Sequence, residues 1–428
     1  VLNTQALTDA EKEKVKENVG AVQVKDTVQS EVTVDDQGNV VIAFSDGSKA
    51  KLTSGSTIRE MNKNDLQQDI DDDEKVKNSD NYKDASDSAR ETYDAAIEAG
   101  KQVNSDSNAT QEAINQAHGV IQKALQGLKD SAAKAKEKLN TNVDETPVGD
   151  HNKVDDVEKG AIAQAVADAN KNNGVTKDKV TVDDQGNATV TFPDGSKAVV
   201  PASSTTTNVS KEALKAATGS EHDAVQADTA NAYNSITDSS SDNLKALKKA
   251  YEDAITAGNK VLANDKEPQR DVDAATKKIH DTLADLTKAV INDTADTFAK
   301  EVTNDKFASD AARETYNQAL KDAKATAAKT DASQNALDQA YNDLQKAKLD
   351  LLKGEKSAVT SDLNYKNADD DKKQAYDAAI KQAQAAVTPA EVKTAIATLE
   401  NAKSGLNGDQ KLADAKDKAK QTVDNLPN

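Results

Sequence analysis

The feature that most constrains this sequence is internal repetition, because a chain that repeats its pattern must repeat its local fold. Residues 32–50 read VTVDDQGNVVIAFSDGSKA, and residues 180–198 read VTVDDQGNATVTFPDGSKA. Apolar and polar residues alternate in both blocks, which is typical of a strand with one buried face. The Gly residues in DDQGN and in DGS supply positive φ for two turns. Each block is therefore predicted to form a three-stranded antiparallel meander.

A meander of three strands needs a cover for its apolar face. An amphipathic stretch precedes each block, at about residues 8–20 and again at residues 154–171. We therefore expect two small α+β modules, each with one helix packed on a three-stranded sheet. Residues 140–153 carry Pro and Gly, and residues 201–210 are rich in Ser and Thr. Both stretches are predicted to be linkers.

A second, helical pattern occurs four times and begins with the marker Tyr-x-x-Ala-Ile/Leu. The marker tyrosines of repeats one to four are Tyr93, Tyr251, Tyr316 and Tyr376. Spacings of three and four residues place the Tyr, the Ala and the aliphatic residue on one helical face. A second helix follows each marker, and in repeat one it carries Ile114, Ala117, Ile121 and Leu128. Ser86 or Asp87 is expected to cap the marker helix of repeat one.

Two amphipathic helices cannot close a core, so each repeat needs a third helix. The candidates are residues 64–79 for repeat one and 211–236 for repeat two, and in repeats three and four the last helix of the preceding repeat can continue and serve. The predicted fold class is multi-domain and mainly α, an elongated tandem array of three-helix bundles with two small α+β modules. The predicted domains are 1–60 and 151–205 (small α+β modules), 61–140, 206–291, 292–354 and 355–407 (helical bundles), and 408–428 (the start of a further module).

Composition limits the chemistry that this chain can perform. The 428 residues include no Cys, which excludes a disulfide, a thiolate metal site and a thiol nucleophile. The 74 Asp and Glu exceed the 55 Lys and Arg, for a net charge of −19. That balance argues against nucleic acid as a partner and against docking on anionic lipid. Because no apolar run approaches the roughly 18 residues of a membrane span, no membrane insertion is expected.

No pattern in the sequence indicates catalysis. The four histidines, His118, His151, His222 and His280, do not recur at equivalent positions, since His118 aligns with Thr276, Tyr341 and Ile396. They are therefore interpreted as structural or solvated. The acidic run 69–74 (DIDDDE) is expected to cap or precede a helix, with weak cation binding as the alternative. We predict no enzyme activity and no catalytic, cofactor or metal residue, and leave the ligand-binding residues unassigned.

The tyrosines allow two interpretations. The marker tyrosines lie in register with Ala and Ile, which indicates a place in the core. Tyr82 and Tyr365 lie nearer the predicted bundle ends and are expected to be the more exposed pair, as sugar-stacking side chains would be.

The helical repeats resemble FIVAR repeats of Gram-positive cell-wall-anchored surface proteins. The resemblance rests on Tyr82-Lys83-x-Ala85 with the Tyr93 marker, and on Tyr365-Lys366-Asn367-Ala368 with the Tyr376 marker. Repeat two departs from the pattern at Ser240. Repeat three has Asp305 at this place, and Phe307 from a nearby turn is expected to substitute.

Two further segments carry resemblances. Residues 408–428, which end in Asn425-Leu426-Pro427-Asn428, look like the start of a truncated GA-type three-helix module. A FIVAR-to-GA junction is similar to the giant extracellular-matrix-binding proteins. The strand blocks are similar to small modules of lactobacillus surface proteins. The sequence is interpreted as a fragment of a longer protein.

The resemblance implies a non-enzymatic repeat segment of a bacterial surface adhesin without a cofactor. Its implied partners are host extracellular-matrix or mucus glycoproteins or epithelial surface glycans, bound through multivalent weak contacts. The implied location is extracellular, on a cell surface, with a cell-wall anchor outside this sequence, and the chain is expected to be monomeric. Two alternatives stay open: a purely structural stalk that spaces a distal adhesive domain from the wall, and accessory modules of a secreted glycan-active enzyme.

Overall fold

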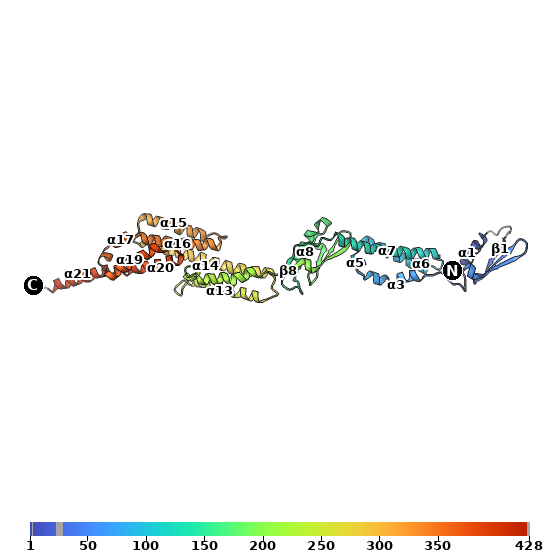
Figure 1. Cartoon of the computed structure of the whole chain (residues 1–428), viewed down its shortest axis with the longest axis horizontal. Coiled ribbons are helices and arrows are strands. Elements are labelled where there is room, and N and C mark those ends of the chain that lie inside the picture. The colour runs from blue at the N-terminus through green and yellow to red at the C-terminus, as the bar shows by residue number, and fades with distance from the viewer. Residues whose placement is uncertain (2, 23–28, 426–428) are drawn as a thin grey trace. The chain divides into compact units, whose positions relative to one another are not determined.

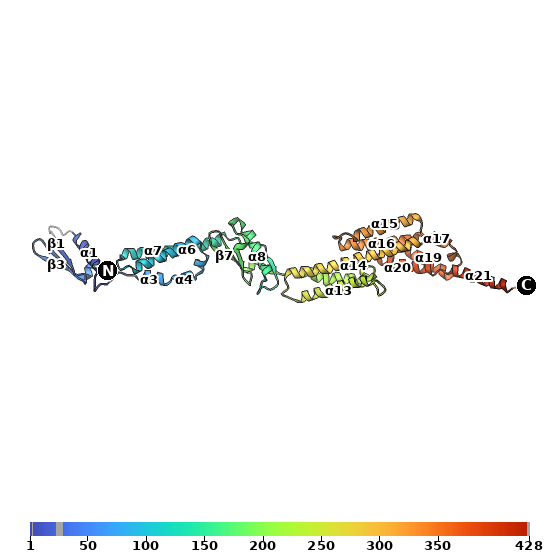
Figure 2. The same ribbon diagram turned by 180° about the vertical axis from the view of Figure 1, so that it is seen from behind.

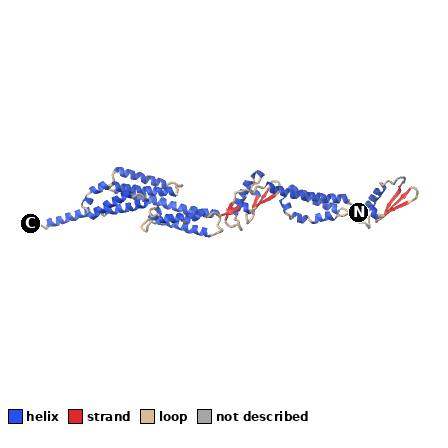
Figure 3. Cartoon of the chain, viewed as in Figure 1, coloured by secondary structure: helices blue, strands red, loops and turns tan. Residues whose placement is uncertain are grey.

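The computed structural model describes residues 1, 3–22 and 29–425. The chain divides into two compact units, Val1–Thr207 (unit 1) and Asn208–Asn428 (unit 2). Helices dominate both units, and all strands of the described residues lie between Gln29 and Asn208 (Figure 3). The predicted class, mainly α and multi-domain with small strand modules, is confirmed.

The first α+β module follows the prediction. Helix α1 (Asp9–Gly20) begins after a capping box in which Thr8 and Glu11 exchange hydrogen bonds. Strands β1 (Gln29–Val34), β2 (Val40–Phe44) and β3 (Lys49–Leu52) pair antiparallel in the order β1-β2-β3. The short helix α2 (Ser54–Thr57) follows β3. A small core forms around Leu7, Val15, Val40 and Ile42.

The second α+β module repeats this plan in unit 1. Helix α8 (Asp156–Ala169) has its own capping box, and the 3-10 turns η1 (Lys171–Asn173) and η2 (Lys177–Lys179) lead into the sheet. Strands β5 (Val180–Val182), β6 (Ala188–Thr191) and β7 (Lys197–Val200) pair antiparallel in chain order. The core buries Ile162, Val166, Val190 and Phe192. Gly186, at the tip of the first hairpin, has a φ of +92°, as the sequence predicts.

The predicted linkers 140–153 and 201–210 are instead part of the second α+β module, so this prediction is wrong. Strand β4 (Thr146–Val148) pairs with β8 (Thr206–Asn208) in a two-stranded sheet, and α9 (Ala202–Thr205) precedes β8. Val148 is buried in the module's core. The Gly149 N–H donates to Glu158 Oε1 at 3.0 Å. Polar composition indicated a linker, but one apolar anchor and one buried carboxylate suffice to hold the segment on the module.

Repeat one is a bundle in which the third helix is broken. Its two long helices are α6 (Asp87–Ser105) and α7 (Gln111–Lys138). Beside them lie α3 (Asn64–Asp71), α4 (Asp73–Lys77) and α5 (Asp80–Asp84) (Figure 2). The upstream segment is therefore correctly identified but is three short helices, which break at Asp72 and again at Ser79, the residue that caps α5. Ser86, rather than Asp87, caps α6 by accepting from the Ala89 N–H.

Unit 2 holds the other three repeats (Figure 1). Repeat two consists of α10 (Glu212–Thr218), α11 (Ser220–Ala227), α12 (Ala232–Ser235), α13 (Asp242–Ala263) and α14 (Gln269–Asn304). Repeat three adds α15 (Asp310–Ala327) and α16 (Gln334–Gly354). Repeat four adds α17 (Lys356–Ser361), α18 (Leu363–Lys366), α19 (Asp370–Ala385) and α20 (Pro389–Ser404), and α21 (Gly408–Asp424) follows. Leu426 and Pro427, which belong to the GA-type resemblance, lie outside the described residues.

Neighbouring repeats in unit 2 share helices, as the sequence allows. Helix α14 has 36 residues without Gly or Pro, so nothing in its sequence stops it at the predicted boundary between residues 291 and 292. Its first half packs on α13 and its second half on α15 and α16. One continuous core therefore runs from Leu214 to Leu351 through repeats two and three. The predicted domain boundary between residues 291 and 292 therefore falls inside one helix and one core.

Candidate functional site

Each repeat is organised around its marker tyrosine. Tyr93, Tyr251, Tyr316 and Tyr376 are the largest fully buried side chains of the described residues, so the prediction of a core role is confirmed. The Tyr251 hydroxyl contacts His222 Nδ1 at 3.1 Å. The other three marker hydroxyls are buried without a hydrogen-bond partner among the described residues. Burial raises the pKa of the Tyr251 hydroxyl to about 12 and raises the pKa values of the other three further.

A second tyrosine packs edge-to-face on the marker ring in three repeats. Ring centroids lie 6.0 Å apart for Tyr82–Tyr93, 5.7 Å for Tyr233–Tyr251 and 5.9 Å for Tyr365–Tyr376. The hydroxyl of each second tyrosine donates to the carboxylate that directly follows the marker. These acceptors are Asp94, Glu252 and Asp377, each at 2.9 Å. The arrangement fixes the third, broken helix against the marker helix.

This geometry corrects three expectations. Tyr82 and Tyr365 are more exposed than the marker tyrosines, as expected, but they are only half-exposed and their hydroxyls are hydrogen-bonded, so they do not form an open stacking pair. In repeat two, Tyr233 occupies the place that the pattern assigned to Ser240. In repeat three the second ring is Phe298 of α14, 6.3 Å from Tyr316, while Phe307 packs against the core of repeat four.

Repeat three loses both partners of the hydrogen bond together. Phe298 has no hydroxyl that could donate a hydrogen bond. The residue after the repeat-three marker Tyr316 is Asn317 instead of an acid. The acid that follows the marker is thus a sequence signal for a second tyrosine in the same repeat. In repeat two this acid is Glu252, and it could have directed the search to the upstream Tyr233.

The histidines and the acidic run make contacts inside their own modules. His118 Nδ1 lies 2.7 Å from Asp69 Oδ2, and Gln122 also donates to this buried carboxylate. His280 pairs with Glu221 at 2.9 Å, and His151 lies 3.4 Å from the Thr206 hydroxyl. Of the acidic run, residues 72–74 lie at the start of α4, as expected. Asp69 is instead a buried polar group of α3.

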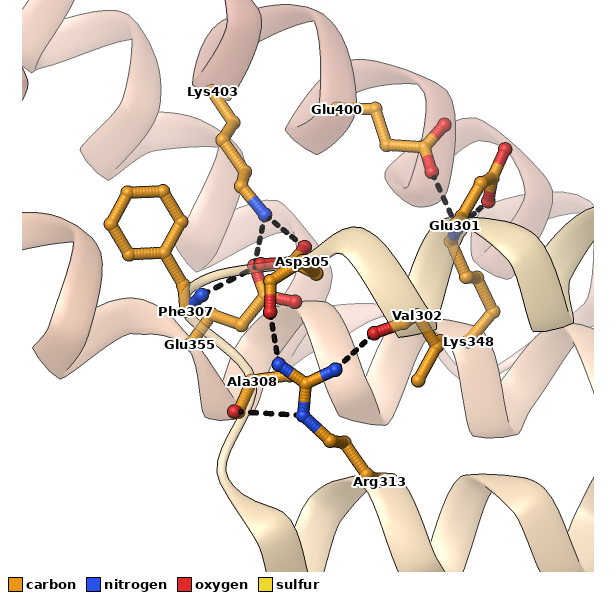
Figure 4. Close-up of polar contacts among 10 residues, drawn as sticks. All are labelled: Glu301, Val302, Asp305, Phe307, Ala308, Arg313, Lys348, Glu355, Glu400 and Lys403. Atoms are coloured by element: carbon orange, nitrogen blue, oxygen red, sulfur yellow. Dashed lines mark hydrogen bonds and ion pairs between the residues drawn. The ribbon is translucent and has the colours of Figure 1, made fainter.

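The densest cluster of charges lies where repeats three and four meet (Figure 4). Lys403 of α20 contacts Asp305 Oδ2 at 2.6 Å and also pairs with Glu355. Asp305 caps the end of α14, and Glu355 links α16 to α17, so one ammonium joins three segments. The Phe307 ring lies 5.1 Å from the Lys403 ammonium. Lys403 side-chain contacts therefore connect residues that are 98 and 48 positions away in sequence.

Glu355 is the most deeply buried acid of this cluster, with 1 % of its surface exposed. Its Oε1 has no hydrogen-bond partner among the described residues. Burial raises the pKa of the Glu355 carboxyl to about 7, although the Lys403 ammonium opposes this shift. The pKa of Asp305 is lowered instead. Burial raises this pKa, but the hydrogen bonds from Lys403 and the Phe307 N–H lower it by more.

A second ion pair and an arginine surround the cluster. Lys348 is 4 % exposed and pairs with Glu301 and, at 3.1 Å, with Glu400. Arg313 donates to the carbonyls of Val302, Asp305 and Ala308, which end α14 and begin the turn to α15 (Figure 4). Lys348 and Arg313 thus bind acids and helix-end carbonyls of the surrounding segments, which suits a structural joint.

Clefts also lie elsewhere among the described residues. One in unit 1, of about 430 Å³, is lined by residues that include Lys14, Ile58, Met61 and Thr110. One in unit 2, of about 210 Å³, lies among Tyr233, Thr287, Gln334 and Asp338. The described residues contain no group of three or more His, Asp or Glu placed to hold a metal ion. Nor does any described helix have the length and apolarity that crossing a membrane requires.

Comparison with known families accounts for most of the chain. The family model of the FIVAR domain matches residues 62–129, 210–287, 288–352 and 354–407, which together exceed half of the sequence. The model of the atypical Rib domain matches residues 1–61 and 137–209, the two α+β modules. The match 137–209 includes β4 and β8, in agreement with the structure.

Solved structures are similar to part of the chain. EbhA (756-1003 domain) from Staphylococcus aureus is 20 % identical over 50 % of this chain and 87 % of its own, with a TM-score of 0.19. The sialic acid binding region of the Streptococcus sanguinis SK1 adhesin, bound to 3'sLn, is 14 % identical over 49 % of this chain and 64 % of its own, with a TM-score of 0.18. No curated protein matches the sequence. Both TM-scores are too low to bear on function.

Proposed function

Because this chain belongs to the FIVAR domain family and also carries two atypical Rib domains, we propose that it is a non-enzymatic repeat segment of a bacterial surface adhesin. In this proposal it acts outside the cell, attached to the cell wall through a region beyond this sequence. It binds host extracellular-matrix or mucus glycoproteins or epithelial glycans through many weak contacts.

The observation that supports the proposal is that the four repeats have similar residues in their interiors and different residues on their surfaces. The marker tyrosine is buried in every repeat, and three repeats keep the hydrogen bond from the second tyrosine to the following acid. The charged groups with the densest contacts, such as Lys403 and Glu355, bind one another. What such a framework offers a partner is therefore its outer surface.

Repetition turns weak contacts into useful attachment. When one repeat is bound, its neighbours stay at a high effective concentration near the same surface, so avidity exceeds the affinity of one repeat without any new contact. The excess of acidic residues keeps the chain soluble and disfavours nucleic acid and anionic lipid as partners.

A binding screen of the full chain tests this proposal. The chain is biotinylated at one end and presented either singly or as streptavidin tetramers to fibronectin, mucin and an array of epithelial glycans. A helical protein of the same net charge is the control. We expect saturable binding to at least one surface that increases on tetramerisation. Absence of binding above the control on every surface would refute the adhesin function.

A second candidate is a structural stalk that binds nothing and spaces a distal domain. It is favoured by the sharing of α14 and α16 between successive repeats of unit 2. In addition, Lys393 of repeat four donates to the Thr229 carbonyl of repeat two at 2.6 Å. Single-molecule stretching tests this candidate: repeats two and three should unfold in one step, and the binding screen should be negative.

A further inference from the structure

The joint between repeats three and four contains one ammonium for two carboxylates. Lys403 contacts both Asp305 and Glu355, and no other cation is within ion-pair distance of these two acids among the described residues. When both acids are ionised, the group carries one uncompensated negative charge. That charge falls mainly on Glu355, which is almost fully buried and has one oxygen without a partner. Burying such a charge destabilises the joint.

We propose that Glu355 is a proton-operated latch, so that uptake of one proton by this carboxyl tightens the joint between repeats three and four. The proton removes the uncompensated charge and leaves Lys403 and Asp305 as a balanced pair. The joint is therefore held more firmly in mildly acidic surroundings than in alkaline ones.

The groups that face Glu355 come from every element packed around it. They are Lys403 of α20, Asp305 at the end of α14 and the Tyr376 hydroxyl of α19. The Tyr376 hydroxyl stays neutral over the range considered, because burial raises its pKa. Seven residues before Glu355 on α16, Lys348 pairs with Glu301 and Glu400. Also on α16, Lys353 pairs with Asp350. No described group within ion-pair distance of Glu355 other than Lys403 compensates its charge.

Repeat one offers a natural comparison at the equivalent place. Asp73 lies twenty residues before the marker Tyr93, and Glu355 lies twenty-one before Tyr376. Asp73 has two lysines, Lys77 at 3.3 Å and Lys101 at 3.8 Å, and its side chain is 15 % exposed. These two lysines also pair with Asp94 and Glu98, so they are shared among three acids. Asp73 therefore has two lysine partners and a partly exposed side chain, whereas Glu355 has one lysine, shared with Asp305, and is almost fully buried.

The direction of the pH effect follows from linkage. The pKa of Glu355 is about 7 in the folded chain against 4.5 for an ordinary Glu. Its stabilising contribution is therefore complete below about pH 4.5 and is lost as the pH rises towards and through 7. Asp305 and Lys403 do not contribute in this window, because the pKa of the acid is lowered and that of the amine is raised.

Hydrogen exchange on the full chain tests the latch. After correction for intrinsic rates, peptides of α19 and α20 should open on the order of 100-fold more at pH 8 than at pH 5. Glu355→Gln should remove this difference and protect these peptides at pH 8. The matched variant Asp73→Asn should leave the pH response of repeat four unchanged. An unchanged response in Glu355→Gln would overturn the proposal.

A measurement on the unmodified chain covers the case in which Glu355→Gln fails to fold. Carboxyl carbon resonances of uniformly Glu-labelled protein are followed by NMR between pH 3 and 9. A glutamate that titrates near 7 and is shifted by Lys403→Met supports the latch. Titration of every glutamate below pH 5.5 would refute it.

Discussion

The Tyr233 hydroxyl donates to Glu252 Oε1 at 2.9 Å, which reproduces in repeat two the bond that Tyr82 makes to Asp94 in repeat one. Tyr82 lies 11 residues before its marker and Tyr233 lies 18 before its own. The repeats therefore preserve a spatial arrangement and not a spacing along the chain. The bond joins the broken third helix to the marker helix.

A double-mutant cycle on Tyr365 and Asp377 should measure the worth of this bond. Tyr365→Phe removes the donor, and Asp377→Asn weakens the acceptor. Each change should lower the free energy of unfolding of repeat four by about 1 kcal/mol, because the group left behind is half-buried and not fully desolvated. The double variant should cost less than the two single costs combined. Simple additivity, measured by urea unfolding, would show that the two side chains do not interact.

Substitution of equivalent core residues should unfold one repeat in one case and two repeats in the other. Ile121→Asp and Ile279→Asp each place a charge in a fully buried position, at a cost of at least about 3 kcal/mol. The first should expose only repeat one, whose core is its own, to hydrogen exchange. The second should expose repeats two and three together, because they share one core. Confinement of the Ile279→Asp effect to repeat two, residues 210–291, would contradict the shared core.

Alanine substitutions at two glycines distinguish the cost of a left-handed backbone from the cost of a steric clash. Gly186 has φ +92°, and a Cβ there would lie 2.7 Å from Thr206 Cγ2. Gly47 has φ +87° but no atom within 4 Å of a Cβ. Gly47→Ala should therefore cost about 1 kcal/mol from the left-handed conformation alone. Gly186→Ala should cost more and should loosen β8, as thermal unfolding and hydrogen exchange of residues 202–208 will report.

Asp194 and its counterpart Asp46 should titrate differently. Burial pushes the pKa of Asp194 up, but bonds from the Ser196 hydroxyl and the Lys138 ammonium outweigh this and lower it to about 2. Asp46 receives the equivalent bonds from Ser48 without a lysine. The contribution of Asp194 is present above about pH 3.8 and is lost as the pH falls towards 2.

Lys138→Met should therefore raise the pKa of Asp194 towards that of Asp46 and leave Asp46 unchanged. Carboxyl NMR of Asp-labelled protein measures both groups in one sample. Equal pKa values for Asp194 with and without Lys138 would show that the lysine does not act on this carboxyl.

The sequence alone determined the local elements, because each depends on neighbours close in the chain. Alternation predicted the strands, Gly after Asp-Gln predicted the positive φ of Gly38 and Gly186, and the Tyr-x-x-Ala-Ile spacing predicted which faces are buried. The length of α14 was also readable, since no residue within it stops a helix.

Only the tertiary structure decided which distant residues fill equivalent places. Tyr233, Phe298 and Phe307 are all aromatic and precede a marker tyrosine in sequence. They pack in repeats two, three and four respectively, and their spacing from the marker does not predict this. The pairing of β4 with β8 likewise joins segments whose composition resembles linkers. The contact of Lys403 with Asp305 and Glu355 depends on three helix ends meeting. Such contacts follow from the way whole helices pack, which no local pattern records.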